Sequence, residues 1–284
     1  MIRKPTASWW AVRLAATLVL ILTGLALYAY WEASWDPVVR RADVALAGWP
    51  KGEKPVTVLL VSDTHVAGPE MPPERLARIV DGLNALKPDL VVLTGDYVSD
   101  KKVATHRYSV GESVAPLGRL RSRLGIVGVL GNHDHWRGAP AFRDAFARHR
   151  IALLANEAIR RGPLVIGGVD DEPTGHSDLA ATQGAMTALG AGPRILLSHS
   201  PDIMPSVRAG VTAVMAGHTH CGQIALPFIG PLVTMSRYGK RFACGHIVNA
   251  GTDLFVSAGV GTSILPLRFG APPDVWLIRF GPKP

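Results

Sequence analysis

Aspartate, asparagine and histidine residues follow several short apolar runs of this chain. The residues that could bind a metal ion there are Asp63, His65, Asp96, Asn132, His199, His218 and His220. Two runs end in a pair of such residues spaced i and i+2, which point the same way on an extended segment and can share one ion. Carboxylate and amide oxygens mixed with imidazole suit Mn, Fe or Zn. Each motif alone could be a polar turn, but together and in this order they predict a metal site.

The apolar runs before these residues are short and rich in β-branched side chains, which is typical of buried strands. The predicted strands cover residues 56–63, 89–96, 125–132, 164–171, 194–200, 211–218, 254–258 and 275–280. The predicted helices cover residues 74–86, 110–123 and 139–150, with one more between 171 and 194. Strands that alternate with helices imply an α/β layered fold, in which ligands collect outside the carboxyl ends of the strands.

Composition sets limits on the partners. Hydrophobic residues make up 48% of the 284 residues and charged residues 18%, so a sizeable core can form. The net charge of +8 favours anionic partners such as phosphate compounds or anionic lipid, although a solvated basic surface explains it equally well. No basic strip interleaved with aromatic residues is present, so nucleic acid is not an expected partner.

The chain has two cysteines, Cys221 and Cys244, and no CxxC pair. Zinc held by thiolates is therefore excluded as the main organising device. Cys221 directly follows His220, and we expect it to be a small buried side chain. The alternatives are that the Cys221 thiol coordinates a metal ion, that it is oxidised, or that it forms a disulfide with Cys244 if the domain lies outside the cytoplasm.

Residues 9–31 are almost all apolar and are interrupted only by Arg13. This length suits a transmembrane helix, and aromatic residues at both ends suit the membrane interfaces, which favours an uncleaved anchor over a signal peptide. Basic residues precede the span and acidic residues follow it, which places the following domain outside the cytoplasm, although Arg40 and Arg41 weaken this orientation. We therefore expect an anchor in residues 1–31, a linker in 32–54 and one folded domain in 55–284.

The ordered motifs DxH, GD, GNHD, H and GHxH resemble the calcineurin-like metallophosphoesterases over residues 56–258. The stretches "SHSPD", "GGVDD" and "GHTHCGQIALPFIGP" resemble a bacterial membrane-anchored branch related to UDP-2,3-diacylglucosamine pyrophosphatase-like and cell-wall phosphoesterases. The resemblance implies a four-layer α/β/β/α sandwich, here preceded by one N-terminal transmembrane helix. It also implies two divalent metal ions, which would be Mn, Fe or Zn.

The resemblance also implies a role for each site residue. The first ion would be held by Asp63, His65 and His220, and the second by Asn132, His199 and His218. Asp96 would bridge the two ions. His133 would lie beside the phosphate and protonate the leaving oxygen, and Asp134 would orient the His133 ring.

These roles imply a dinuclear phosphohydrolase that cleaves a phosphodiester or pyrophosphate by a metal-activated hydroxide. With an anchor in the bacterial inner membrane, the expected substrate is a phosphorylated small molecule or envelope lipid. UDP-2,3-diacylglucosamine of lipid A biosynthesis is one candidate, although it would be met on the cytoplasmic side. The alternatives are a nuclease or protein phosphatase on the same core, and a non-catalytic metal-binding module, which the intact motifs disfavour. No feature of the sequence indicates an oligomeric state.

Overall fold

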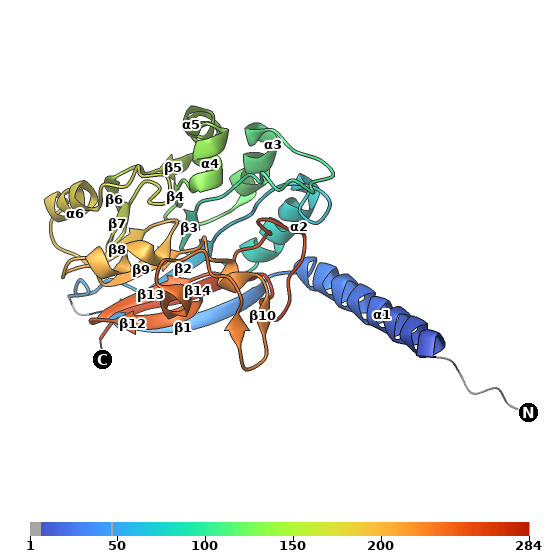
Figure 1. Ribbon diagram of the computed structural model, residues 1–284. Coiled ribbons are helices and arrows are strands. Elements are labelled where there is room, and N and C mark those ends of the chain that lie inside the picture. Colours follow the sequence, from blue (N-terminus) through green and yellow to red (C-terminus); the bar gives the residue numbers. More distant parts are fainter. Residues whose placement is uncertain (1–6, 47, 284) are drawn as a thin grey trace, which may run out of the picture.

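Two six-stranded sheets pack face to face within residues 7–46 and 48–283, which the computed structural model describes (Figure 1). The first sheet contains, in spatial order, β1 (Val38–Leu46), β14 (Asp274–Pro282), β2 (Val56–Val61), β3 (Leu90–Thr94), β4 (Ile126–Val129) and β5 (Ile151–Leu153). The second contains β12 (Gly245–Asn249), β13 (Thr252–Val256), β9 (Ala213–Ala216), β8 (Arg194–Leu197), β7 (Leu164–Gly168) and β6 (Glu157–Arg161).

Helices cover the outer face of each sheet. Those over the first sheet are α2 (Pro73–Asn84), α3 (Val110–Val114), η1 (Ala115–Arg119) and α5 (Ala139–Arg148). Those over the second sheet are α6 (Leu179–Ala188), η2 (Pro201–Ser206) and η4 (Gly239–Phe242). The layers therefore run helix, sheet, sheet, helix, which confirms the predicted four-layer sandwich.

The alternation of side chains along the strands explains why the central strands are apolar throughout. In β2, Val58 and Leu60 face the core between the two sheets, whereas Leu59 and Val61 face the core beneath α2. Successive side chains of a strand point to opposite faces, so a strand covered on both faces needs no polar position. This burial produces the short apolar runs that precede the polar motifs.

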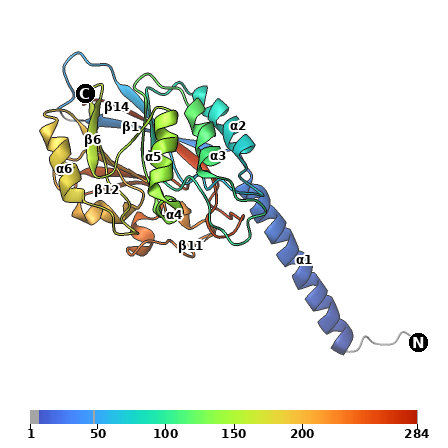
Figure 2. The ribbon, with the colours of Figure 1, turned by 90° about the horizontal axis from the view of Figure 1, so that it is seen from above.

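The N-terminal helix α1 (Ala7–Ala33) projects away from the sheets (Figures 1 and 2). At 1.5 Å per residue its 27 residues extend about 40 Å, longer than the roughly 30 Å hydrocarbon core of a bilayer. Its apolar part, Trp9–Ala33, makes it a candidate membrane span. Among the side chains of α1 that the structure describes, only those of its last turns, Ala29, Glu32 and Ala33, are buried.

The C-terminal end of α1 is fixed to the domain by hydrogen bonds. The carbonyl of Ala29 accepts from the backbone N–H of Arg268 at 2.8 Å. The Glu32 carboxylate accepts from the backbone N–H groups of Gly270 and Ala271 at 3.2 and 3.1 Å. Because Ala29, Glu32 and Arg268 are buried, these hydrogen bonds fix the end of the helix to the domain.

The segment 32–54 is not the simple linker that we predicted. It contains β1, which pairs in parallel with the whole of β14 at the edge of the first sheet. Val44 and Leu46 are buried in the core between the sheets, while Arg41 and Asp43 point outward. The charged residues obscured this strand in the sequence, and charges on an edge strand also discourage pairing with other chains.

Several short elements were not predicted. These are α4 (Asn132–Arg137), η3 (His220–Gly222), β5, β6, β12, and the hairpin of β10 (Ala225–Leu226) and β11 (Gly230–Pro231). Each lacks the length that makes a periodic pattern visible, because two to six residues cover less than two helical turns or a few strand positions.

Candidate metal centre

Five strands from both sheets deliver polar side chains to one edge of the sandwich. β2, β3 and β4 are parallel neighbours in the first sheet, and β8 and β9 are parallel neighbours in the second. The residues that directly follow these strands are Asp63, His65, Asp96, Asn132, His199, His218 and His220. Because parallel strands end at the same edge, seven residues that are far apart in sequence meet in one place.

The first group consists of Asp63, His65 and His220, whose ligand atoms all lie within 4.8 Å of one another. The Nε2 atoms of His65 and His220 are 3.0 Å apart, and Nε2 of His220 is 3.5 Å from an Asp63 oxygen. All three side chains are buried.

The second group consists of Asn132, His199 and His218. Nε2 of His199 lies 3.1 Å from the Asn132 side-chain oxygen and 3.1 Å from Nδ1 of His218. Asp96 stands between the two groups, because its Oδ2 is 3.4 Å from Nε2 of His65 and 3.2 Å from Nε2 of His199. One carboxylate oxygen therefore faces a ligand nitrogen of each group.

The backbone of the site is strained. Five of these seven residues have a positive φ, between 41° and 67°; they are Asp63, His65, Asp96, His218 and His220. Non-glycine residues rarely adopt this left-handed conformation, and its concentration at one place is typical of a functional site. The sequence gives no direct signal of this strain.

Glycine is required immediately before Asp96. Gly95 has a φ of +94°, and a Cβ there would lie 2.6 Å from the backbone nitrogen of Gly131 and 2.8 Å from Nδ1 of His199. These distances are shorter than real Cβ contacts, so any side chain would push apart the loops that carry Asn132 and His199.

Burial keeps several of the imidazoles neutral. It lowers the pKa of His218 to about 3 and lowers the pKa values of His65 and His220 well below the usual range. Burial also opposes protonation of His199, but the Asp96 carboxylate together with Asp63 and Asp171 outweighs it, so the pKa of His199 is raised well above the usual range. Neutral imidazoles present lone pairs, which is the form that binds a cation.

The residues fit a pair of divalent cations. Two pairs of imidazole nitrogens face each other at 3.0 and 3.1 Å, and carboxylate or amide oxygens lie beside each pair. A single cation among each set of donors would satisfy all of their lone pairs at once. The mixture of nitrogen and oxygen donors suits Mn, Fe or Zn.

His133 lies at the mouth of this site. Its ring packs edge-on against His65 at 4.8 Å between centroids, and its Nδ1 is 3.2 Å from a carboxylate oxygen of Asp100. Trp136 packs edge-on against the other side of His133 and is 65% exposed, so it is not a core residue. A partly exposed imidazole held beside a carboxylate can donate a proton to a bound substrate.

Asp134 does not orient the His133 ring, contrary to the expectation from the sequence. Its two carboxylate oxygens accept from the backbone N–H groups of Asp96, Tyr97 and Gly131 at 2.8 to 2.9 Å. It therefore fixes the loop that carries Asp96. Asp100, which belongs to no motif, takes the place beside His133 and was missed for that reason.

Cys221 and Cys244 form a disulfide, with 4.7 Å between their Cα atoms. Our expectation of an unpaired, buried thiol at Cys221 is therefore wrong, although Cys221 is buried. The bond ties the turn that carries His218 and His220 to the start of β12. Sequence reasoning could not decide this pairing, because the segment between the cysteines, which are 23 positions apart, contains no long element.

An open depression of about 630 Å³ adjoins the second group. It is lined by His218, Thr174, Asp202, Met235 and Arg237, among others. The Arg237 backbone N–H donates to Asp202 at 2.8 Å, and the Arg237 guanidinium pairs with Glu172. The depression therefore offers both charged and neutral hydrogen-bonding groups next to the metal ligands.

The calcineurin-like phosphoesterase family model matches residues 56–222. An uncharacterized metallophosphoesterase of Bacillus subtilis is 30% identical over 233 residues, which cover 80% of this chain and 79% of that protein. The chain belongs to the calcineurin-like phosphoesterase family. It is a phosphoester hydrolase, and members of its family use two divalent metal ions.

Two further comparisons concern a relative with a membrane-protein name and a solved structure. A transmembrane protein with a metallophosphoesterase domain from Danio rerio is 28% identical, over 91% of this chain and 61% of that protein. The solved structure of the NAD nucleotidase of Haemophilus influenzae superposes with a TM-score of 0.50 at 14% identity, over 73% of this chain and 46% of that chain. The latter likeness shows a shared fold.

Proposed function

We propose that this protein is a membrane-anchored dinuclear hydrolase that cleaves a phosphodiester or pyrophosphate bond of an envelope lipid or lipid-linked compound. The observation that carries the proposal is the position of Asp96 Oδ2, 3.4 Å from a nitrogen of the first group and 3.2 Å from a nitrogen of the second. A carboxylate so placed can bridge two ions that act on one phosphoryl group.

The bound ions would supply charge neutralisation and an activated water. The chain's own residues would hold the ions, position the reacting groups and donate a proton. Asp63, His65 and His220 would hold one ion, and Asn132, His199 and His218 the other, with Asp96 shared. His133 would give its proton to the leaving oxygen, and Asp100 would hold the ring of His133. Asp134 would keep Asp96 in place.

Two features support a substrate in the cell envelope. The candidate span α1 would hold the domain next to a bilayer, and the net charge of +8 favours anionic lipid. The disulfide between Cys221 and Cys244 favours an oxidising compartment, as the charge distribution around α1 also does. We therefore infer a single-pass inner-membrane protein with residues 55–284 outside the cytoplasm, which disfavours UDP-2,3-diacylglucosamine as the substrate.

The test uses detergent-solubilised protein that is stripped of metal and reloaded with Mn, Fe or Zn. Bis-p-nitrophenyl phosphate, p-nitrophenyl phosphate and UDP-2,3-diacylglucosamine would be assayed in parallel with wild type and Asp96→Asn. We expect metal-dependent turnover of the diester that the variant loses. Bound metal without turnover of any substrate would contradict the proposal, and preferred turnover of UDP-2,3-diacylglucosamine would contradict the extracytoplasmic placement.

A further inference from the structure

The hairpin of β10 and β11 exposes an unusual apolar tip. Phe228, at the centre of the three-residue turn, is fully exposed, and Ile229 beside it is 57% exposed. Phe228 also has a φ of 65°, a conformation that favours glycine or asparagine over an aromatic residue. Neither the backbone conformation nor packing within the domain thus favours a bulky apolar side chain at position 228.

The tip belongs to a larger apolar surface. Exposed side chains nearby are those of Leu232 and Val233, which follow the hairpin, and of Ile264 and Leu265. The loop of Ile264 and Leu265 is joined to the hairpin base through Gln223, whose side chain donates to the Leu265 carbonyl at 2.9 Å. Contiguous exposed apolar surface of this kind marks an interaction site.

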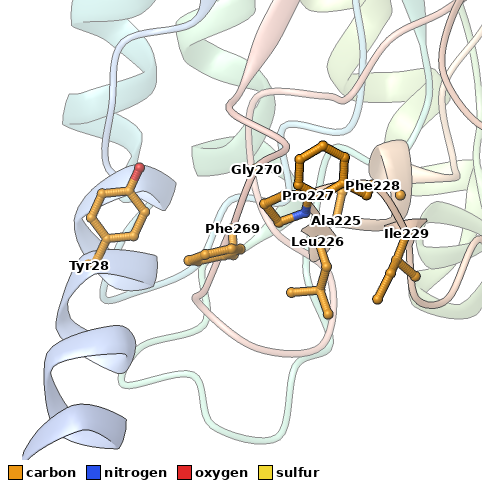
Figure 3. Close-up of a pocket in the computed structure, with 9 residues that line it drawn as sticks. Tyr28, Ala225, Leu226, Pro227, Phe228, Ile229, Phe269 and Gly270 are labelled. Atoms are coloured by element: carbon orange, nitrogen blue, oxygen red, sulfur yellow. The ribbon is translucent and has the colours of Figure 1, made fainter.

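This surface is continuous with the end of the anchor helix. The backbone N–H of Ala225 donates to the carbonyl of Phe269 at 2.7 Å, and the Phe269 ring packs edge-on against Tyr28 of α1 at 5.7 Å between centroids. Tyr28 and Phe269 line one cavity of about 740 Å³ together with Leu226, Phe228 and Ile229 (Figure 3). The hairpin therefore lies beside the last turns of α1.

The position of Tyr28 indicates that the hairpin lies at the level of a membrane interface. Tyr28 and Trp31 lie at the domain end of the span Trp9–Ala33, where aromatic residues mark the interface of a membrane. The tip of a hairpin beside Tyr28 would lie at the same depth relative to the bilayer. Lys240, whose ammonium donates to the Ile229 carbonyl at 2.5 Å, would then lie at the level of anionic headgroups.

We propose that the hairpin of residues 225–231 is a second membrane contact, which inserts Phe228 and Ile229 into the interface of the bilayer that α1 crosses. This inference rests on the anchor in the proposed function but not on catalysis. Two contacts would stop the domain from rotating about α1. Because the hairpin begins five residues after His220, insertion would also hold the metal-site edge close to the lipid surface.

The test measures depth with a fluorescent probe on single cysteines. Both native cysteines are in the disulfide, so an introduced thiol can be labelled alone. Phe228→Cys and, separately, Ile229→Cys would carry a polarity-sensitive fluorophore in the full chain, reconstituted in vesicles of phosphatidylethanolamine and phosphatidylglycerol. Val248→Cys is the matched control, because Val248 is 66% exposed at the far end of β12. Val19→Cys, within α1, reports the span itself.

We expect lipids with a nitroxide on the acyl chain to quench the probes at 228 and 229 at least twofold more than the probe at 248. Quenching of both hairpin probes by aqueous iodide, with the probe at 19 protected, would overturn the hairpin contact alone. An iodide-accessible probe at 19 would overturn the anchor and the contact with it. In detergent, the probes at 228 and 229 could instead become more protected from iodide as the protein concentration rises. That result would show a contact between copies of this chain in place of the membrane contact. Turnover of bis-p-nitrophenyl phosphate reports the hydrolase independently of all these outcomes.

Discussion

The guanidinium of Arg268 lies 3.4 Å from the His220 imidazole, measured from Nη2 to Nδ1. Arg268 is fully buried and donates to the carbonyls of Ala258, Gly259, Gly261 and Ala271 at 2.5 to 3.1 Å. Its backbone N–H donates to Ala29 of α1. Burial lowers the pKa of Arg268 to about 10, so it remains charged at neutral pH. One residue thus links α1, a buried loop and a predicted metal ligand.

Replacement of Arg268 should therefore affect the stability of the domain. Arg268→Met removes the donor to the buried carbonyls of Ala258, Gly261 and Ala271, and we expect it to lower the free energy of unfolding by about 3–5 kcal/mol. Denaturant unfolding of the detergent-solubilised protein measures this. The control is Arg279→Met, because Arg279 forms only an exposed pair with Asp43 at 3.7 Å and should contribute less than about 0.5 kcal/mol. Equal effects of the two variants would show that the buried carbonyls do not depend on Arg268.

Asp96→Asn should reduce both metal content and turnover. The amide keeps the size of the side chain but loses the charge that would be shared between two cations, so we expect less than two ions per chain and at least a roughly hundredfold lower rate. Elemental analysis and initial rates measure the two effects. Asp81→Asn is the matched control, since Asp81 pairs with Arg119 on the surface. Two tightly bound ions in Asp96→Asn would show that Asp96 is not the bridge.

Asp100→Asn should slow the reaction without loss of metal. Asp100 contacts His133 but none of the seven predicted metal ligands, so we expect kcat to fall by about tenfold while KM and metal content stay unchanged. Steady-state kinetics on bis-p-nitrophenyl phosphate separate kcat from KM. The exposed Asp144→Asn on α5 controls for the change of charge. A raised KM with normal kcat would assign Asp100 to substrate binding rather than to positioning His133.

Loss of the disulfide should destabilise the loop beside the metal site. Cys221→Ser with Cys244→Ser removes a cross-link between residues 23 apart, and we expect a loss of about 2–4 kcal/mol in the free energy of unfolding. Thermal unfolding of the double variant, compared with reduced and oxidised wild type, measures it. In intact cells, thiol alkylation followed by mass spectrometry should find both cysteines blocked by the disulfide. Free thiols there would place the domain in a reducing compartment.

The sequence could predict those parts of the fold that have long periodic patterns. α2 keeps its apolar stripe of Leu76, Ile79, Val80 and Leu83 against the first sheet, because helical periodicity depends on that one face. β1 could not be predicted in the same way. Its charged positions look like linker, and its partner β14 is more than 200 residues away in the chain. Pairing between strands so far apart in the chain produces no local sequence pattern.

The same distinction applies to the site. The seven predicted metal ligands share motifs at strand ends, and the structure brings them together. Asp100 and Arg268 act through contacts across 33 and 48 residues, and neither lies in a motif. Asp134 has the residue type expected for an orienting carboxylate, but its orientation depends on where the N–H groups of Asp96 and Tyr97 point. Such orientation is a property of the folded backbone.

The position of β14 has a consequence for biogenesis. β14 lies between β1, which follows α1, and β2, so the first sheet joins segments that are more than 200 residues apart in the sequence. A nascent chain cannot complete this sheet until β14, more than 200 residues after β1, has left the ribosome. Until then β1 and β2 lack the strand that joins them, and a chain truncated before residue 274 would leave the exposed edges of β1 and β2 to quality-control proteases.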